Sequence, residues 1–242
     1  FGRIIQANAG LEVGDYVFSA GLDEEIFGLN DSTLSLGALY YGNNALPIPK
    51  IRWQTNGWVD SPILSTVFSF KAYLAHGWME KNRFQSSALL HQKYLYGRAQ
   101  FFNKKLSLIA GLHHNALWSG RNLDQEQMQP GGFKNYARIF LGKSGGADAL
   151  QTDQNNALGN HLGAYELKGS YAFKGFTISN YWQFLWEDSS GLTPFNWRDG
   201  MVGLSVELNK SSLIKKLVVE VVRTNDQDAE KQGKDGQPFL EP

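Results

Sequence analysis

The feature that most constrains this chain is an alternation of apolar and polar residues with a period of two, repeated in about ten segments. Successive side chains of a β-strand point to opposite faces, so this pattern predicts strands with one apolar and one polar face. We therefore expect an all-β protein built from antiparallel strands that follow one another along the chain. The expected strands cover residues 5–13, 16–23, 34–38, 68–78, 88–102, 106–115, 164–173, 176–186, 202–208 and 216–221.

The composition favours a β-barrel and excludes several other classes. Aromatic residues make up 13% of the 242 residues, and 26 are glycine. The chain has no cysteine, which excludes disulfides, thiolate metal sites and a cysteine nucleophile. Lys+Arg and Asp+Glu both total 23, so no basic excess points to nucleic acid as a partner. No segment approaches the ~18 apolar residues of a membrane helix.

The connections distinguish a soluble barrel from a membrane barrel. A soluble barrel turns its apolar face inward, whereas a membrane barrel turns it toward lipid. Tight turns are expected at residues 14–15, 103–105, 174–175 and 209–212, and longer connections at about 23–32, 79–87, 119–160 and 187–198. Short and long connections thus lie on opposite rims, which is typical of bacterial outer-membrane barrels. We therefore predict a transmembrane antiparallel β-barrel in the bacterial outer membrane, with lipid around it and the long loops outside.

One connection breaks this rule. Residues 40–64 follow the expected third strand on the short-turn rim, yet they are long and include Pro47-Ile48-Pro49. We expect them to fold under the barrel or into its lumen. The same parity puts both ends of the chain outside the cell, whereas barrels of this class keep their termini in the periplasm. Residues 1–242 are therefore expected to be a single barrel domain that is incomplete at both ends, with an odd number of strands missing on each side.

Residues 119–160 form an expected external loop that is too long for a simple connection. Within it, apolar residues at i, i+3, i+4, i+7 and i+8 predict an amphipathic helix that ends at Gly142. A second short helix is expected to begin near Thr152 or Asp153. We expect the pair to cap the barrel or plug its lumen. The residues of the plug helix are Phe133, Tyr136, Ala137, Phe140 and Leu141.

Polar residues of several strands are expected to line the lumen. The alternation puts His113 and Asn115 on this face and turns His114 toward lipid or the membrane interface. The mixed charges indicate either a salt-bridged wall around a plug or a polar pore whose charges tune selectivity. The predicted wall comprises Lys71, Arg98, His113, Asn115, Glu166 and Lys168, with Glu207, Lys216 and Glu220 further along the chain.

Catalysis and metal binding are both disfavoured. An outer-membrane hydrolase needs a His, a Ser and an Asn or Asp within hydrogen-bond reach. His113-His114-Asn115 lies near Ser119 in sequence, but nothing marks a nucleophile, so we expect structural hydrogen bonds and a non-enzymatic protein. Metal-ligand spacing is missing among the histidines, and no calcium-loop repeat surrounds the loop aspartates, so no metal or cofactor is expected. The residues considered are His91, His113 and His161, and Asp124, Asp148, Asp153 and Asp188.

The external loops carry the residue types that bind sugars. Aromatic faces pack on sugar C–H groups, while acids, amides and arginine bind the hydroxyls. The alternative is that these tryptophans belong to the interfacial girdle and that the charges are ordinary loop charges. The predicted polysaccharide-binding residues are Trp118, Arg121, Asn122, Trp186, Glu187, Asp188, Asn196, Trp197 and Arg198.

Seven segments carry a resemblance to a known family. They are NALPIPKI (44–51), YLAHGW (73–78), LHQKYLY (90–96), GLHHNALW (111–118), FLGKSGG (140–146), LGNHLG (158–163) and WEDSSG (186–191). In this order they resemble the Wzi-like capsule assembly outer-membrane proteins, in their Bacteroidetes branch. The resemblance implies a barrel of about eighteen strands with a helical plug, of which this chain would be the larger part.

The resemblance also implies a function. It points to a non-enzymatic, lectin-like role in which the barrel binds or displays capsular polysaccharide at the cell surface. Two alternatives stay open. One is a porin or transporter for a small polar solute. The other is an accessory barrel in a larger complex, with other outer-membrane proteins as partners.

Overall fold

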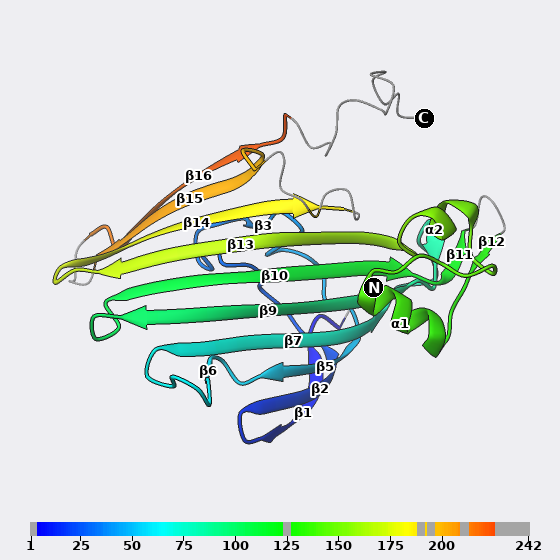
Figure 1. Cartoon of the computed structure of the whole chain (residues 1–242), viewed down its shortest axis with the longest axis horizontal. Coiled ribbons are helices and arrows are strands. Elements are labelled where there is room, and N and C mark those ends of the chain that lie inside the picture. The colour runs from blue at the N-terminus through cyan, green and yellow to red at the C-terminus, as the bar shows by residue number, and fades with distance from the viewer. Residues whose placement is uncertain (1–3, 123–126, 188–191, 193–196, 209–212, 226–242) are drawn as a thin grey trace.

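The computed structural model describes residues 4–122, 127–187, 192, 197–208 and 213–225. Within these ranges the main sheet has 11 strands, and ten of them pair in chain order as antiparallel neighbours (Figure 1). The all-β, antiparallel prediction is therefore confirmed. The ten are β1 (Ala7–Val13), β2 (Tyr16–Leu22), β5 (Lys50–Thr55), β7 (Phe68–Trp78), β9 (Leu89–Phe101), β10 (Leu106–Trp118), β13 (Asn160–Ala172), β14 (Phe176–Trp186), β15 (Gly200–Leu208) and β16 (Lys216–Arg223).

Smaller elements surround this sheet. β6 (Val59–Asp60) pairs with β7, and β3 (Gly37–Ala38) forms a hairpin with β4 (Tyr41–Gly42). A three-stranded sheet contains β8 (Gln85–Ser86), β11 (Gly120–Asn122) and β12 (Gln127–Gln129). The helices are α1 (Phe133–Leu141) and α2 (Gln151–Asn155). Neither described helix is long and apolar enough to cross a membrane.

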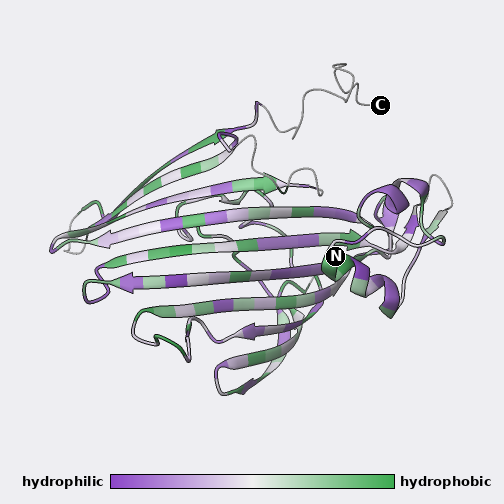
Figure 2. Cartoon of the chain, viewed as in Figure 1, coloured by the Kyte–Doolittle hydropathy of each residue, from purple (hydrophilic) through white to green (hydrophobic). Residues whose placement is uncertain are grey.

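The sheet has two chemically different faces. Figure 2 shows hydrophobic and hydrophilic residues alternating along the long strands. We call the face that carries Glu166 the inner face and the opposite face the outer face. Large apolar side chains stand exposed on the outer face, as at Phe18, Leu95, Leu108 and Val219. In the described residues the edge strands β1 and β16 do not pair with each other, so the sheet is open and no closed barrel is formed.

The expected third strand, residues 34–38, is wrong. Only Gly37 and Ala38 of this range are in a strand, and they belong to the small hairpin. The reason is local: the carboxylate of Asp31 accepts hydrogen bonds from the backbone N–H groups of Thr33 and Leu34, at 3.0 and 2.9 Å. This side-chain capping turns the chain where an extended strand would have begun.

The true third strand is β5, which lies inside the connection expected at residues 40–64. Its outward residues Ile51 and Trp53 give only two apolar positions, and its inward residues Lys50 and Arg52 are buried charges. Because buried charges are rare, a short strand with this composition resembles a loop. With β5 in place, the connection that crosses the inner face is residues 23–49 instead.

This correction reduces the irregularity in loop lengths. The two longest connections, residues 23–49 and 119–159, lie at one end of the sheet, which we call the long-loop end, and the other is the short-turn end, where residues 56–67 are the one longer connection. The long-loop connections are residues 23–49, 79–88, 119–159 and 187–199. The short-turn connections are residues 14–15, 56–67, 102–105, 173–175 and 209–215.

The main buried core lies between residues 23–49 and the inner face. Phe27 and Tyr40 pack there against Tyr73, Ala75 and Ala164 of the wall. In Figure 1, β3 from this segment lies behind the strands while α1 lies in front of them. The sheet is therefore covered on both faces, by two different parts of the chain.

Candidate functional site

The candidate site is the long-loop end of the sheet together with its two coverings. We call residues 23–49 the inner segment, because its side chains contact the inner face. Helix α1 covers the outer face of the same strands.

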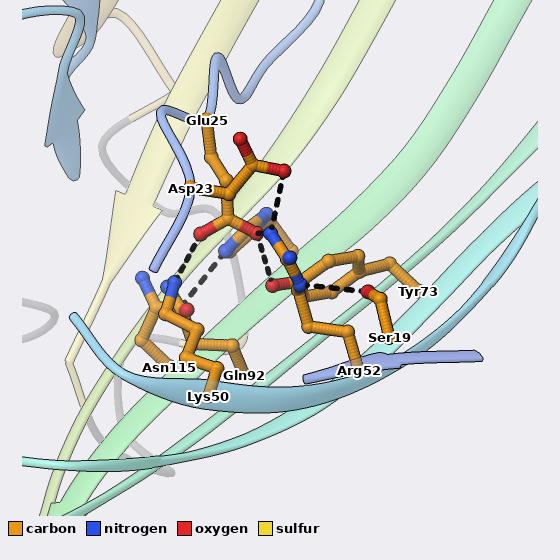
Figure 3. Close-up of polar contacts among 9 residues, drawn as sticks. Ser19, Asp23, Glu25, Lys50, Arg52, Tyr73, Gln92 and Asn115 are labelled. Atoms are coloured by element: carbon orange, nitrogen blue, oxygen red, sulfur yellow. Dashed lines mark hydrogen bonds and ion pairs between the residues drawn. The ribbon is translucent and has the colours of Figure 1, made fainter. Parts of the chain in front are cut away.

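The first anchor of the inner segment is a charge cluster on β5 (Figure 3). Lys50 forms a buried ion pair and hydrogen bond with Glu25, and the Tyr73 hydroxyl donates to the same carboxylate at 2.6 Å. Arg52 Nη1 donates to Asp23 Oδ2 at 3.1 Å and lies 3.5 Å from Glu25 Oε1. Lys50 and Arg52 are both buried, and buried charges need compensation. The two acids of the inner segment supply it.

The second anchor is Glu166 on β13, which is 1% exposed. Its carboxylate accepts the Leu29 backbone N–H at 2.6 Å and the hydroxyls of Tyr40 and Tyr96 at 2.7 Å each. Hydrogen bonds to a charged acceptor are stronger than neutral ones. Burial, together with the neighbouring Tyr96 and Glu166, raises the pKa of Tyr40 above its ordinary range, so its hydroxyl stays a donor. Glu166 thus binds two separate points of the inner segment.

The third anchor joins Asp31 to β16, the last described strand. Lys216 Nζ lies 3.0 Å from Asp31 Oδ2, and the Thr33 hydroxyl donates to Oδ1 at 2.7 Å. Burial acts to raise the pKa of Asp31, but hydrogen bonds from Thr33, Lys216 and two backbone amides outweigh it and hold the pKa well below its usual range. Gln183 on β14 adds a contact by accepting the Leu39 N–H at 2.5 Å. The inner segment is therefore held from β5 to β16.

On the outer face, the predicted helix α1 is confirmed with its C-terminal cap. Gly142 adopts a left-handed conformation with φ 61°, which ends the helix as a glycine readily does. Ile139 is 0% exposed and packs against Trp118 and Leu158. The Tyr136 ring lies 5.5 Å from that of His91. The second predicted helix is present as α2.

The cap-or-plug role of α1 stays a prediction, but α1 does not lie on the inner face, where a plug would be. The helix contacts side chains of the face opposite to the inner segment, so it does not fill the inner side of the sheet. Its apolar stripe defined which helix face is buried but not which face of the sheet would receive it. Of the expected plug residues, Tyr136 and Phe140 pack on the outer face, and Phe133 is 86% exposed. Lys93 supports Phe140, with its ammonium 3.9 Å from the ring centroid and bonded to the Phe140 carbonyl.

The histidines divide between the two faces as the alternation predicts. His113 lies on the inner face, with Nε2 2.9 Å from Asn115 Oδ1. His114 lies on the outer face, where Nε2 is 2.7 Å from His161 Nδ1. His161 Nε2 is 2.8 Å from the Leu158 carbonyl oxygen. Over the ranges that the structure describes, no three His, Asp or Glu side chains are grouped as a metal site. A purely structural role for these contacts stays a prediction.

The predicted inner-wall residues share one face of the sheet. Glu166 is bound by the inner segment, and Lys216 by Asp31 and by Glu207, whose carboxylate is 3.3 Å from the ammonium. Nearer the short-turn end, the Arg98 guanidinium lies 4.5 Å from the Trp58 ring centroid. Lys71 lies over Tyr94, Lys168 lies over Tyr181, and the Tyr181 hydroxyl donates to Glu220.

The predicted sugar-binding residues do not form one cluster. Trp118 and Trp186 are only 4% and 9% exposed, because Trp118 lies under α1 and Trp186 stacks on His114. Neither ring therefore offers a free face, which corrects their expected role. Trp197 is 60% exposed, with the Arg198 guanidinium 5.5 Å from its ring centroid.

The remaining predicted residues are spread along the long-loop end. Arg121 is exposed on β11, in the small three-stranded sheet, and Glu187 is exposed directly after β14. The backbone of Asn122 lies in β11, but its side chain lies outside the description. Asp188 and Asn196 fall outside the described residues, as does Asp124.

Sequence reasoning missed the acids of the inner segment. Asp23, Glu25 and Asp31 lie in a connection that carries no basic residue between Asp23 and Pro49. The available signal was Lys50 and Arg52, two cations that follow this acidic stretch at inward positions of a strand.

The comparisons with known proteins give one match. A family model described as "Capsule assembly protein Wzi" matches residues 2–237, which is nearly the whole chain. The matched range includes the inner segment, α1 and every described strand of the main sheet. No curated protein and no solved structure matches the chain.

Proposed function

Because this chain belongs to the family described as Capsule assembly protein Wzi, we propose that it is an outer-membrane protein that holds surface polysaccharide during capsule assembly. Family membership indicates the role in capsule assembly. The lectin-like binding, the membrane position and a non-enzymatic mode of action are parts of the proposal. The features below support them.

The outer face supports a position within a membrane. Its exposed apolar side chains, such as Leu11, Leu167 and Val221, recur from β1 to β16. A membrane-embedded sheet cannot leave its edges unpaired, because each unsatisfied backbone group in lipid costs several kcal/mol. Our proposal therefore includes further strands that pair with the free edges of β1 and β16 and close the barrel.

The observation that carries the proposed function is the inner segment. It crosses the inner face at the long-loop end and is held by the buried charges of Lys50 and Glu166 and by the partly exposed Lys216. A segment bound from β5 to β16 would obstruct a passage along this face. An obstructed barrel suits a protein that works at its rim better than one that conducts solutes.

The rim offers groups suited to a sugar polymer. An exposed indole beside a guanidinium, at Trp197 and Arg198, combines a flat apolar face with hydroxyl-binding donors. We propose this pair as the centre of polysaccharide contact, with Arg121, Glu187 and Asn122 as further contacts spread along the long-loop end. Asp188 and Asn196 remain candidates by sequence proximity.

Binding of capsular polysaccharide to the intact protein in detergent tests the proposal. Titration calorimetry with Trp197→Ala/Arg198→Ala is expected to show affinity lowered at least about tenfold, or roughly 1.4 kcal/mol. The matched control is Phe173→Ala/Lys174→Ala, an aromatic and a cation at the short-turn end, which should leave affinity unchanged. Equal losses in both variants, or no binding by the unmodified protein, would contradict the proposal.

A porin is the second candidate, and one observation favours it. Lys71, Arg98 and Lys168 lie on the inner face nearer the short-turn end, as charges lining a pore would. Planar-bilayer conductance separates the two candidates. We expect the intact protein to be closed and Glu25→Gln/Glu166→Gln to open it by loosening the inner segment. Steady conductance by the intact protein would favour the porin.

A further inference from the structure

A long apolar groove lies on the outer face beside α1. It has a volume of about 620 Å³, within the ~300–1,000 Å³ range of small-molecule pockets. Its floor is made by outward residues of β1, β2, β5 and β7, and the Tyr136 ring of α1 closes one side. The main floor residues are Leu11, Phe18, Ala20, Ile51, Trp53 and Leu74.

A second cavity continues this groove along the helix. It measures about 240 Å³ and shares Trp53 and Leu74 with the first. Its far side is formed by Lys93 and Phe140. The two cavities thus follow one side of α1 from Tyr136 to Phe140, over a wall that is otherwise apolar.

The charged side chain on the outer wall of the groove is positive. By strand register, Lys93 is the one charged side chain on the outer face of the described long strands from β1 to β15. The stretch 131–147 contains Lys134, Arg138 and Lys143, and Asn135 of the same helix donates a hydrogen bond to the next acid, Asp148. Lys134 and Lys143 are exposed near the two ends of the nine-residue helix, which is about 14 Å long.

We propose that this groove holds an acyl chain of one anionic membrane lipid, with its headgroup against the basic stretch of α1. The inference rests on the proposed membrane position of the sheet. The groove is continuous with the apolar outer face that would meet lipid, which supports a lipid occupant. Basic residues at a membrane surface attract anionic headgroups, and an amphipathic helix lies naturally at that boundary. α1 then marks the level of the headgroups.

Native mass spectrometry of the intact protein tests this directly. The protein is reconstituted in phosphatidylcholine vesicles that contain a minor fraction of phosphatidylglycerol, then extracted in detergent. We expect one phosphatidylglycerol to stay bound to each chain. Ala20→Trp, which fills the groove, should lower the lipid-bound fraction about tenfold. The control Ala110→Trp, at an exposed outward position on β10 away from the groove, should leave it unchanged.

A second pair of variants tests the headgroup. Lys134→Gln and Lys143→Gln should each reduce the preference for phosphatidylglycerol over phosphatidylcholine by about fivefold. Equal retention by Ala20→Trp and Ala110→Trp would overturn the inference, as would a dimer that covers the groove in place of lipid. Failure of the protein to insert into vesicles would overturn both this inference and the proposed membrane position. Insertion without retained lipid would overturn this inference alone.

Discussion

The inner segment and α1 cover opposite faces of the same strands, and they are held by different forces. Lys50 and Glu166 bind the inner segment through buried ion pairs and charge-assisted hydrogen bonds. α1 is held by the buried Ile139 and by aromatic and imidazole rings. The difference shows that the chemistry of each face selects its covering. A wall with buried charges requires acids opposite it, whereas a wall of rings requires apolar contact.

Removing one buried charge should have the largest effect on the difference between the two coverings. Glu25→Gln leaves Lys50 without its acid and leaves Arg52 with Asp23 alone, so we expect a loss of roughly 3–5 kcal/mol in the stability of the docked inner segment. Hydrogen exchange should rise across residues 23–49 but not across 133–141. Glu187→Gln, at an exposed acid, is the control.

A double variant sharpens this result. Adding Lys50→Met to Glu25→Gln removes the orphaned cation, and most of the lost protection should return because a buried pair is often replaceable by apolar groups. Full persistence of the loss in the double variant would show that Glu25 acts by something other than charge compensation.

A substitution in the apolar contact of α1 should weaken the docking of that helix alone. Ile139→Ala removes a fully buried side chain, with an expected cost of about 2–5 kcal/mol to helix docking. Exchange should then rise across residues 133–141 while residues 23–49 stay protected. Phe133→Ala on the same helix should change neither region, because that ring is exposed. If both coverings loosen together in Ile139→Ala, they are one cooperative unit.

Lowering the pH should weaken the docking of the inner segment, because it protonates Asp31. Its pKa is lowered in the folded protein, so it stabilises the folded state above its unfolded pKa of about 4, and this contribution is lost as pH falls below that value toward the folded pKa. We expect exchange across residues 31–39 to rise on acidification below about pH 4. Asp31→Asn should start less protected and show a smaller pH response; an identical response would exclude Asp31 as the cause.

The smallest effect is expected at the end of α1. Lys93→Met keeps the apolar stem but removes the ammonium from both the Phe140 ring and the Phe140 carbonyl, with an expected cost of about 1–2 kcal/mol. Exchange of the last turn of the helix should rise slightly, while Lys134→Met, at an exposed lysine, should have no effect. A large loss in Lys93→Met would show that α1 is held by charge after all.

The sequence predicted local features well and distant contacts poorly. Alternation found β2 and β14 with nearly the observed bounds, and helical spacing found α1, because both signals lie within a few residues. It missed β5, because the inward-facing lysine and arginine make this short strand resemble a loop. It also did not predict that residues 23–49 cover the inner face, since the hydrogen bonds from Leu29 to Glu166 and from Lys216 to Asp31 span 137 and 185 residues.

For the predicted sugar-binding residues at the long-loop end, the residue type indicated exposure less well than the position in the fold. Trp118 and Trp186 have the right chemistry for sugars, but both lie at strand ends where their rings are packed. Trp118 lies beneath α1, and Trp186 stacks on His114. Trp197 lies in the connection between β14 and β15, outside both strands, and stays exposed. Burial of this kind depends on which strands and helices are neighbours, and the sequence of a single segment does not give that information.

The tie between Asp31 and Lys216 has a consequence for the order of folding. The inner segment lies early in the chain, yet its last partner is on the final described strand. Closing so long a loop carries an entropic cost, and contacts between distant residues form late. The ten strands must therefore be aligned before the segment can dock at all three anchors. Docking of the inner segment at all three anchors therefore indicates that the strands of the sheet are fully paired.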